Sequence, residues 1–388
     1  MLTKNREILM PVMGDPGRYR LQIAFTQVNR DEKNRPSFKH FAYRLDTTAF
    51  FYTASMVKLP LAAIALEKLF LLGRGELNRN TRLEYEANYP CQSPVSTDPS
   101  SETGYPTLSN YIRKLFVVSD NDAYNRLYEF VGQKHLNERL WNMGYSSARI
   151  NTRFAGCDAD QNRHTNAVKF ISPEGKLLYR QEPQNYTDKI KNPYGKQIVG
   201  TGRYNDSGQF FEGGWDFTDG NFMSLWDLHR ILISIIFPQA VNPDHRFILM
   251  DRDFDFLKSC MSAMPRECPA PNYNPEEYFD CYVKYLLYGR EKDPVNNPDI
   301  RIFNKVGMAF GFLTDCAYIV DYKNKVEFFL SVTVYVNEDE TINDNKYDYN
   351  NIGLPFLKNL GTLFYQMELN RKKKYPPKLV RAEGLLGR

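Results

Sequence analysis

Two residues of complementary chemistry lie three positions apart at the start of a long apolar segment. They are Ser55 and Lys58 of Ser55-Met56-Val57-Lys58, and Pro60 follows at a place where a helix tolerates proline only in its first turn. On a helix, this spacing puts both side chains on one face. Apolar neighbours lower the pKa of a lysine, so its neutral amine can take a proton from a serine nucleophile. A string of this kind also occurs by chance in a chain of this length.

A second motif, Ser119-Asp120-Asn121, lies between two expected helices. A serine hydroxyl there can relay a proton, and an asparagine amide can donate to and accept from an amide-bearing substrate. The alternative is a simple helix N-cap, which all three residue types favour.

A third motif, Lys305-Val306-Gly307, ends an expected strand and is followed by Met308. A lysine at this position can attract a substrate carboxylate, and Gly307 lets a ligand approach the backbone closely. The alternative is that Lys305 is a charge that protects the edge of a sheet from aggregation.

The segments around these motifs predict both strands and helices. Apolar residues alternate from Tyr19 to Phe25 and again from Phe41 to Leu45, so we expect a hairpin with its turn at 29–36. The run 55–73 predicts a buried helix that ends at Gly73. Further helices are expected at 107–119, 121–132, 135–144 and 224–237, strands at 301–306, 312–320 and 326–336, and a last helix carrying the stripe Phe356, Leu360, Leu363, Phe364 and Met367.

Strands therefore occur near both ends of the chain, with helices between them. This order predicts an α/β (α+β) fold in which one antiparallel sheet is built from both chain ends, is flanked by helices and has a mostly helical subdomain inserted. We expect one catalytic domain over 1–388, with an α/β subdomain from 1–52 and 290–388 and a helical subdomain from 53–289. The helical subdomain includes a long insertion from about Asn151 to Asp219, where the periodicity weakens.

The composition narrows the class of partner. The 388 residues carry 50 Lys and Arg against 46 Asp and Glu, a net charge of +4, so neither nucleic acid nor an anionic membrane is indicated. No apolar run is long enough to span a bilayer, and the N-terminal segment does not resemble a signal peptide. Six scattered cysteines permit disulfides without requiring them, and their spacing to histidine suits no zinc site, so we expect no metal and no cofactor.

The three motifs occur in one order along the chain and together resemble the motif set of class A β-lactamases and penicillin-binding proteins. The resemblance extends over nearly the whole chain. The runs FNKVG and GFLTDCAYIV are similar to those of β-lactamase-like serine hydrolases from Bacteroidetes-like bacteria. This resemblance implies a β-lactamase/transpeptidase-like fold.

The resemblance also implies a role for each motif residue. Ser55 would attack a carbonyl and become acylated while Lys58 takes its proton. Ser119 would pass a proton to the leaving nitrogen, Asn121 would hold the amide side chain of the substrate, and Lys305 would attract its carboxylate. The backbone N–H groups of Ser55 and of Met308, which follows Gly307, would form the oxyanion hole, and Asp120 would brace its loop.

Two positions depart from the family pattern. Val306 stands where the family usually has Thr or Ser, whose hydroxyl binds the carboxylate of a β-lactam. Phe154 and Ala155 stand about where class A enzymes place the glutamate that activates water for deacylation. Asp158, Asp160 or a later acid could replace it, and the sequence selects none of them.

Three functions remain open on these grounds. The first is a β-lactamase-type serine hydrolase of β-lactams or related cyclic or peptide amides, the second a D,D-peptidase or other ester or amide hydrolase, and the third a penicillin-binding or peptidoglycan-sensing module that deacylates slowly. In each case the partner is a small β-lactam or peptidoglycan-like molecule, and the oligomeric state is open. By the resemblance, the protein is expected to be exported and to be periplasmic or lipid-anchored.

Overall fold

The computed structural model describes residues 2–292 and 297–381 and divides the chain into two compact units. The first unit comprises Met1–Val57, Lys191–Ile233 and Cys281–Arg381. The second comprises Lys58–Ile190 and Ser234–Asp280. The unit boundaries differ from the subdomain boundaries expected at 52/53 and 289/290.

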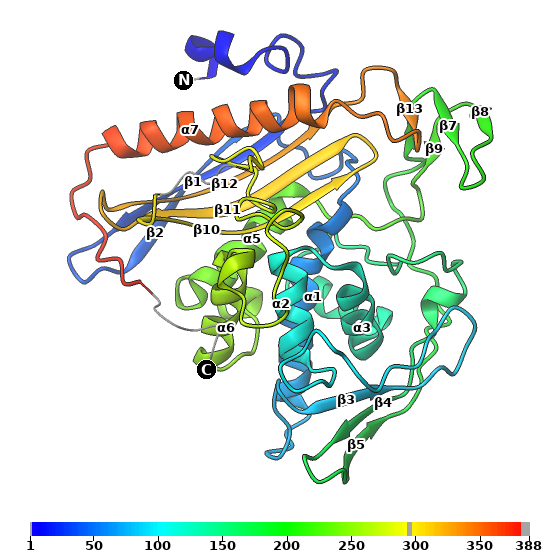
Figure 1. The fold of residues 1–388 in the computed structure, drawn as a ribbon. Helices are drawn as coiled ribbons and strands as arrows, with labels where there is room; N and C mark the ends of the chain where they lie inside the picture. Colours follow the sequence, from blue (N-terminus) through cyan, green and yellow to red (C-terminus); the bar gives the residue numbers. More distant parts are fainter. Residues whose placement is uncertain (1, 293–296, 382–388) are drawn as a thin grey trace. The chain divides into compact units, whose positions relative to one another are not determined.

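A five-stranded antiparallel sheet in the order β10-β11-β12-β1-β2 forms the first unit (Figure 1). Ile23 on β1 lies opposite Val332 on β12, so strands from both ends of the chain meet in one sheet and the predicted fold class is confirmed. The strands and the two helices that pack on them are β1 (Gln22–Arg30), β2 (Pro36–Tyr43), β10 (Ile300–Ala309), β11 (Phe312–Asp321), β12 (Val326–Tyr335), α5 (Leu225–Ile236) and α7 (Leu354–Asn370).

A helix covers each face of the central strands. On one face α7 lies along the sheet (Figure 1), and its Phe364 ring is 4.7 Å from the ring of Phe25. On the other face, His229 of α5 forms hydrogen bonds with the hydroxyls of Thr26 and Ser331. Both β11 and β12 are consequently buried at every position, with their polar groups paired rather than exposed.

The first hairpin is shorter than predicted at its open end. β1 begins at Gln22 rather than Tyr19, and β2 ends at Tyr43 before Leu45. Arg20 and Arg44 have φ angles of +44° and +51°, and such left-handed residues turn the chain out of the extended conformation.

Helices dominate the second unit. The predicted buried helix is present as α1, which is buried continuously from Lys58 to Glu67 and packs against α2, α3 and α6. It is preceded by the short 3-10 helix η3 (Ala54–Val57), so the α-helix begins at Lys58 rather than at Ser55 as predicted. The chain leaves α1 through Gly73, whose φ is +63°. The elements of this unit are α1 (Lys58–Leu71), α2 (Leu108–Val117), α3 (Asn121–Val131), α4 (Gln133–Asn142), α6 (Asp251–Ser262) and a small antiparallel sheet of β3 (Arg82–Tyr85), β4 (Val168–Ile171) and β5 (Leu177–Gln181). Within the described residues, no helix combines the length and apolarity that a membrane span requires.

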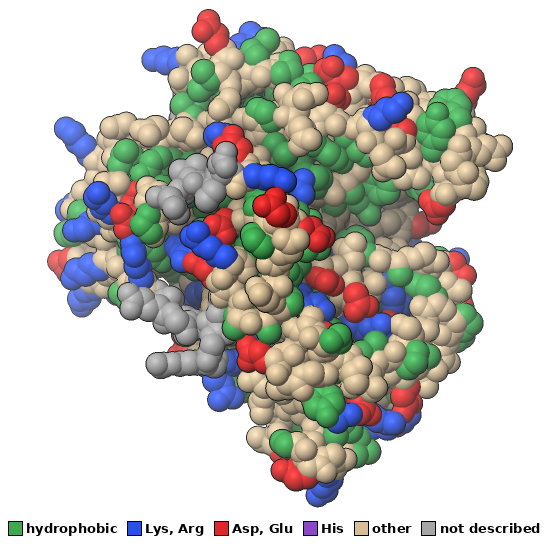
Figure 2. Space-filling view, in the orientation of Figure 1, with side chains coloured by type: hydrophobic (Ala, Val, Ile, Leu, Met, Phe, Trp, Pro, Cys, Tyr) green, Lys and Arg blue, Asp and Glu red, His purple; other side chains and the backbone are tan. Residues whose placement is uncertain are grey.

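The part of the insertion from Lys191 onward belongs to the first unit. It forms the short strands β6 (Ile198–Val199), β7 (Gly202–Tyr204), β8 (Phe210–Glu212) and β9 (Trp215–Asp216). β7 pairs with β13 (Thr341–Ile342), which follows the central sheet in sequence, and this pairing explains why the insertion packs with the sheet. Hydrophobic side chains are exposed over β8 (Figure 2), where Phe210 and Phe211 are 50% and 36% exposed.

Candidate active site

Lys58 is the centre of a polar cluster in the second unit. Its Nζ donates to the backbone oxygen of Ser119 at 2.5 Å and to Oδ1 of Asn121 at 2.6 Å, and it lies 3.4 Å from the Ser119 hydroxyl. The fold therefore brings together the lysine of the first motif and the serine and asparagine of the second.

The surroundings of Lys58 favour its neutral form. Burial lowers the pKa of its ammonium group from 10.5 to about 7, although the nearby charge of Asp120 acts in the opposite direction. The Nζ lies 5.0 Å from the centre of the Phe154 ring, a contact that stabilises a cation far less than water would. An amine with this pKa is partly unprotonated near neutral pH and can act as a general base.

The turn that carries the second motif is held in an unusual conformation. Ser119 has a φ of +61°, which costs a non-glycine residue about 1–2 kcal/mol. The Asp120 side chain accepts a hydrogen bond of 2.7 Å from the backbone N–H of Ala123 and caps α3. Asp120 thus stabilises the start of the helix, and the strained turn directs the Ser119 oxygen atoms toward Lys58. Backbone strain of this kind often occurs at functional sites.

Ser55 lies in the first unit, on the 3-10 helix η3 (Ala54–Val57). This helix packs directly on β10 at Gly307, where a Cβ atom would lie 2.7 Å from the backbone oxygen of Thr53 and 3.3 Å from the Cβ of Ala54. Only glycine permits this approach. The fold therefore brings the segment of Ser55 against the strand that carries the third motif.

The register of β10 leaves the N–H of Met308 at the edge of the sheet. Ala309 lies opposite Phe312 and closes a two-residue turn, so this pair exchanges backbone hydrogen bonds. In an antiparallel ladder the preceding pair, Met308 opposite Leu313, is then not hydrogen-bonded, and its N–H points away from β11. Since β10 is the outermost strand of the described sheet, this N–H can donate to a ligand oxygen.

The other residues of the third motif are buried. Lys305 and Val306 are 1% and 2% exposed, and the Lys305 Nζ donates to the backbone oxygen of Val306 at 2.8 Å. Val306 provides no hydroxyl at the position where the family usually has one.

Phe154 occupies the region where the family pattern calls for a glutamate. Its backbone N–H donates to Oδ1 of Asn125 at 2.8 Å, and its ring lies 4.6 Å from that of Tyr124. These contacts fix an apolar ring, rather than a carboxylate, beside Lys58.

The two acids considered as replacements are engaged elsewhere. Asp158 is exposed and accepts from the backbone N–H of Gln161 at 2.8 Å. Asp160 is also exposed and accepts from the Tyr89 hydroxyl at 2.7 Å. Asp158 organises its own loop and Asp160 joins that loop to Tyr89, so the structure offers no support for either as a deacylating base.

A disulfide joins Cys91 to Cys157, three residues after Phe154. The sequence permitted such a bond but did not identify the pair. The other four cysteines are buried and form no disulfide, namely Cys260, Cys268, Cys281 and Cys316.

Sequence reasoning did not identify an aromatic cluster beside the Met308 strand end, formed by Tyr52, Trp215, Phe217 and Phe310. The Phe310 ring lies 5.0, 5.3 and 6.0 Å from those of Tyr52, Phe217 and Trp215. Phe310 and Gly311 form the two-residue turn with φ angles of +51° and +80°, a turn in which Asn-Gly is favoured. Three aromatic pairs, each worth about 0.5–1.5 kcal/mol, outweigh the cost of about 1–2 kcal/mol for a left-handed Phe310. The sequence feature that could have indicated this cluster is Phe310 before Gly311, where such a turn favours asparagine.

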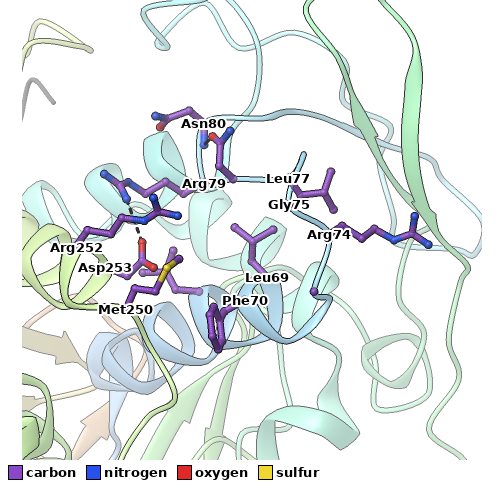
Figure 3. Close-up of a pocket in the computed structure, with 13 residues that line it drawn as sticks. Leu69, Phe70, Arg74, Gly75, Leu77, Arg79, Asn80, Met250, Arg252 and Asp253 are labelled. Carbon is purple, nitrogen blue, oxygen red and sulfur yellow. Dashed lines mark hydrogen bonds and ion pairs between the residues drawn. The ribbon is translucent and has the colours of Figure 1, made fainter.

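A cavity of about 580 Å³ in the second unit contains none of the predicted site residues (Figure 3). It lies at the far end of α1 from Lys58 and is lined by apolar side chains such as Leu69, Phe70 and Met250, with Arg79 paired to Asp253. It is therefore separate from the candidate active site. Within the described residues, no group of three or more His, Cys, Asp or Glu side chains could hold a metal ion.

Comparison with known proteins agrees with the resemblance inferred from the motifs. Residues 20–179 match the model of the Beta-lactamase enzyme family. A beta-lactamase from Sphaerobacter thermophilus is similar in structure, with 13% identity, a TM-score of 0.51 and coverage of 95% of this chain and 97% of the other. A beta-lactamase from Streptomyces albus G has 14% identity, a TM-score of 0.50 and coverage of 92% and 99%. The solved structure described as PBP-A has 12% identity, a TM-score of 0.51 and coverage of 94% and 97%.

A search of curated protein sequences gave no match. At these identities the similar structures establish the fold alone. The resemblance to class A β-lactamases and penicillin-binding proteins is thus confirmed by the family model and by the fold, while the activity rests on the residues themselves.

Proposed function

We propose that this chain is a serine hydrolase of the class A β-lactamase type that forms an acyl-enzyme at Ser55. The observation that carries the proposal is the position of Lys58, a buried amine with a pKa of about 7 held by Ser119 and Asn121. A lysine that only caps a helix or packs in the core does not require a lowered pKa. A general base that acts near neutral pH does.

In the proposed acylation, Lys58 takes the proton of the Ser55 hydroxyl as the Ser55 oxygen bonds to the substrate carbonyl carbon. The carbonyl oxygen becomes an oxyanion that accepts hydrogen bonds from the N–H groups of Ser55 and Met308. When the carbon–nitrogen bond breaks, Ser119 passes its hydroxyl proton to the leaving nitrogen and receives the proton held by Lys58, which returns the amine to its neutral form. Lys305 attracts the substrate carboxylate.

Asn121 has a part in both substrate binding and base positioning. Its Oδ1 accepts from Lys58, which leaves its amide N–H₂ to donate to an amide oxygen of the substrate. Gly307 permits the close packing that keeps the strand end beside Ser55.

Deacylation is proposed to be slow. Phe154 lies where a water-activating glutamate is expected, Asp158 is bound within its own loop, and Asp160 is bound to Tyr89. This feature favours a second candidate, a penicillin-binding or peptidoglycan-sensing module with a persistent adduct. A D,D-peptidase with the same nucleophile and base remains an alternative, because Val306 removes the hydroxyl that binds the β-lactam carboxylate in most of the family.

We propose that the protein is exported and acts on a β-lactam or peptidoglycan-like small molecule. The Cys91–Cys157 disulfide supports export, because such bonds persist mainly in oxidising compartments.

The test combines turnover of nitrocefin with intact-mass analysis after exposure to penicillin. We expect an adduct on the wild-type protein, none on Ser55→Ala, and a normal adduct on the control Ser207→Ala, which removes a hydroxyl in an exposed turn. Fast turnover would favour the lactamase, and a persistent adduct would favour the slow-deacylating module. If the wild-type protein gives neither, the β-lactam proposal is wrong and peptide and ester substrates are tested next.

A further inference from the structure

The cluster of Tyr52, Trp215, Phe217 and Phe310 lies in the same unit as Ser55 and close to it in sequence and in space. Tyr52 precedes Ser55 by three residues, and Phe310 follows Met308 by two. We infer that this aromatic cluster is a subsite for an aromatic ring on the acyl side of the substrate. The inference rests on the proposed function, since it assumes that a substrate carbonyl meets Ser55 and Met308.

The order of residues along β10 gives the direction of the bound substrate. Successive strand residues are about 3.3 Å apart, so Met308 lies roughly 10 Å beyond Lys305 and Phe310 about 7 Å beyond Met308. A substrate with its carboxylate toward Lys305 and its carbonyl oxygen at the N–H of Met308 points its acyl substituent toward Phe310. A ring joined to the carbonyl by one or two atoms would reach the cluster.

The cluster is built for contact with a ligand rather than only for packing. The rings of Phe50 and Phe222, which extend the same set inward, are 8% and 2% exposed. Tyr52, Trp215 and Phe310 are only partly buried and keep part of their surface accessible. Aromatic rings prefer offset or edge-to-face neighbours at 4.5–7 Å, and a further ring from a ligand meets that preference.

Phe310 occupies a turn position that disfavours its residue type, and its aromatic contacts offset that cost. It is the first residue of a turn that favours asparagine, and its φ of +51° is unfavourable for a bulky side chain. An asparagine at this position would satisfy the hairpin at lower conformational cost. The phenylalanine instead places a ring at the end of β10, against Tyr52 and Trp215.

The insertion holds Trp215 rigidly. Trp215 on β9 pairs with Val199 on β6, and the preceding Gly214 is so close to this strand that a Cβ would lie 2.4 Å from the backbone oxygens of Val199 and Gly200. Only glycine fits there, so the approach of β9 to β6 is tight. The inferred role of this part of the insertion is to supply Trp215 and Phe217 to the subsite.

The test compares two β-lactams with the same penicillin nucleus, benzylpenicillin with its phenylacetyl group and 6-aminopenicillanic acid without it. Rate constants of acylation are measured by intact mass. We expect the wild-type protein to react at least tenfold faster with the phenylacetyl compound, and Phe310→Asn and Trp215→Ala to lower that ratio about tenfold. Phe310→Asn creates the favoured Asn-Gly turn, which offsets part of the loss of three aromatic contacts, so the variant should stay folded with a somewhat lower melting temperature.

The matched control is Phe211→Asn, the same change at an exposed ring on β8, which should keep the wild-type ratio. A second measurement, calorimetric binding of both compounds to Ser55→Ala, is independent of chemistry. Tighter binding of the phenylacetyl compound that is lost in Ser55→Ala/Phe310→Asn supports the subsite even where no adduct forms on the wild-type protein. Equal binding of the two compounds, or binding of neither, overturns the inference.

Discussion

The Nζ of Lys58 lies 2.6 Å from Oδ1 of Asn121, across 63 positions of sequence. This hydrogen bond joins the first and second motifs, and the acceptor is a neutral amide. A neutral acceptor binds the ammonium group without adding a negative charge, so it leaves the effect of burial on the Lys58 pKa in place. The type of residue at 121 therefore bears directly on the chemistry of the lysine.

The pH dependence of acylation should follow the ionisation of Lys58. Because burial lowers its pKa to about 7, the neutral amine predominates above that pH and the ammonium below it. The acylation rate should therefore fall up to tenfold per unit as the pH drops below about 7, and should level off above it. Stopped-flow or quenched mass measurements from pH 5 to 9 test this, with circular dichroism at each pH as a control for folding. A rate independent of pH in this range would exclude Lys58 as the base.

Replacement of Asn121 by aspartate should move this profile. A carboxylate within 2.6 Å of Nζ favours the ammonium form and raises the lysine pKa by about 1–3 units. We expect Asn121→Asp to acylate at least tenfold more slowly at pH 7 and to recover part of the rate at pH 9. Asn142→Asp introduces the same charge at the exposed end of α4 and serves as the control. Equal profiles for the two variants would contradict the assigned role.

Gly307→Ala should impair acylation and stability together. The new Cβ would lie 2.7 Å from the backbone oxygen of Thr53, so β10 and η3 must separate. Displacement of one oxyanion donor costs about 10²–10³-fold in rate, and overpacking costs about 1–3 kcal/mol. Urea denaturation and adduct formation measure the two effects. Ala309→Gly, two residues further along β10, is the control for effects that any substitution in this strand would have. A rate within threefold of wild type would show that this contact does not position the site.

Neither Asp158 nor Asp160 should affect the lifetime of the adduct. Both side chains are exposed, and each is already engaged: Asp158 accepts from the backbone N–H of Gln161 and Asp160 from the Tyr89 hydroxyl. We expect Asp158→Asn and Asp160→Asn to leave the deacylation rate within twofold of the wild-type value, as followed by loss of the adduct mass. A tenfold slower deacylation in either variant would identify that carboxylate as the missing base.

Loss of the Cys91–Cys157 disulfide should reduce stability more than it reduces acylation. The bond closes a loop of 66 residues, and a cross-link of this size is worth about 2–4 kcal/mol. The double variant Cys91→Ser/Cys157→Ser should therefore unfold at lower urea concentration. A reducing agent should lower the stability of the wild-type protein but leave that of the double variant unchanged. Equal stability of the two proteins without reducing agent would show that the bond does not form.

Much of the fold could be predicted from local patterns. The alternation in β12 and the apolar run of α1 appear at the expected places, because each depends on residues close in sequence. The ends of the first hairpin could not be predicted, since the left-handed conformations of Arg20 and Arg44 are not evident from residue type.

The candidate site likewise combines features that the sequence predicted with features that only the tertiary structure shows. Spacing alone made Ser55 and Lys58 a pair that chance could also supply. The order of the three motifs and the family resemblance made Ser55, Lys58, Ser119, Asn121 and Lys305 a predicted site. The absence of a glutamate near Phe154 was also evident from the sequence. Only the tertiary structure removed support for Asp158 and Asp160, because it shows their hydrogen-bond partners, one of which, Tyr89, lies 71 positions from Asp160.

The sequence by itself thus determined which residue types are available for acyl transfer, the buried helix that contains Lys58 and the sheet drawn from both chain ends. The tertiary structure decided that Lys58 binds Asn121, that Cys91 pairs with Cys157, and that residues from three segments form an aromatic cluster around Phe310. The physical reason is the range of the interactions. Helix and strand periodicity acts between neighbours, whereas burial and the pKa of Lys58 depend on side chains that the packing brings together from distant parts of the chain.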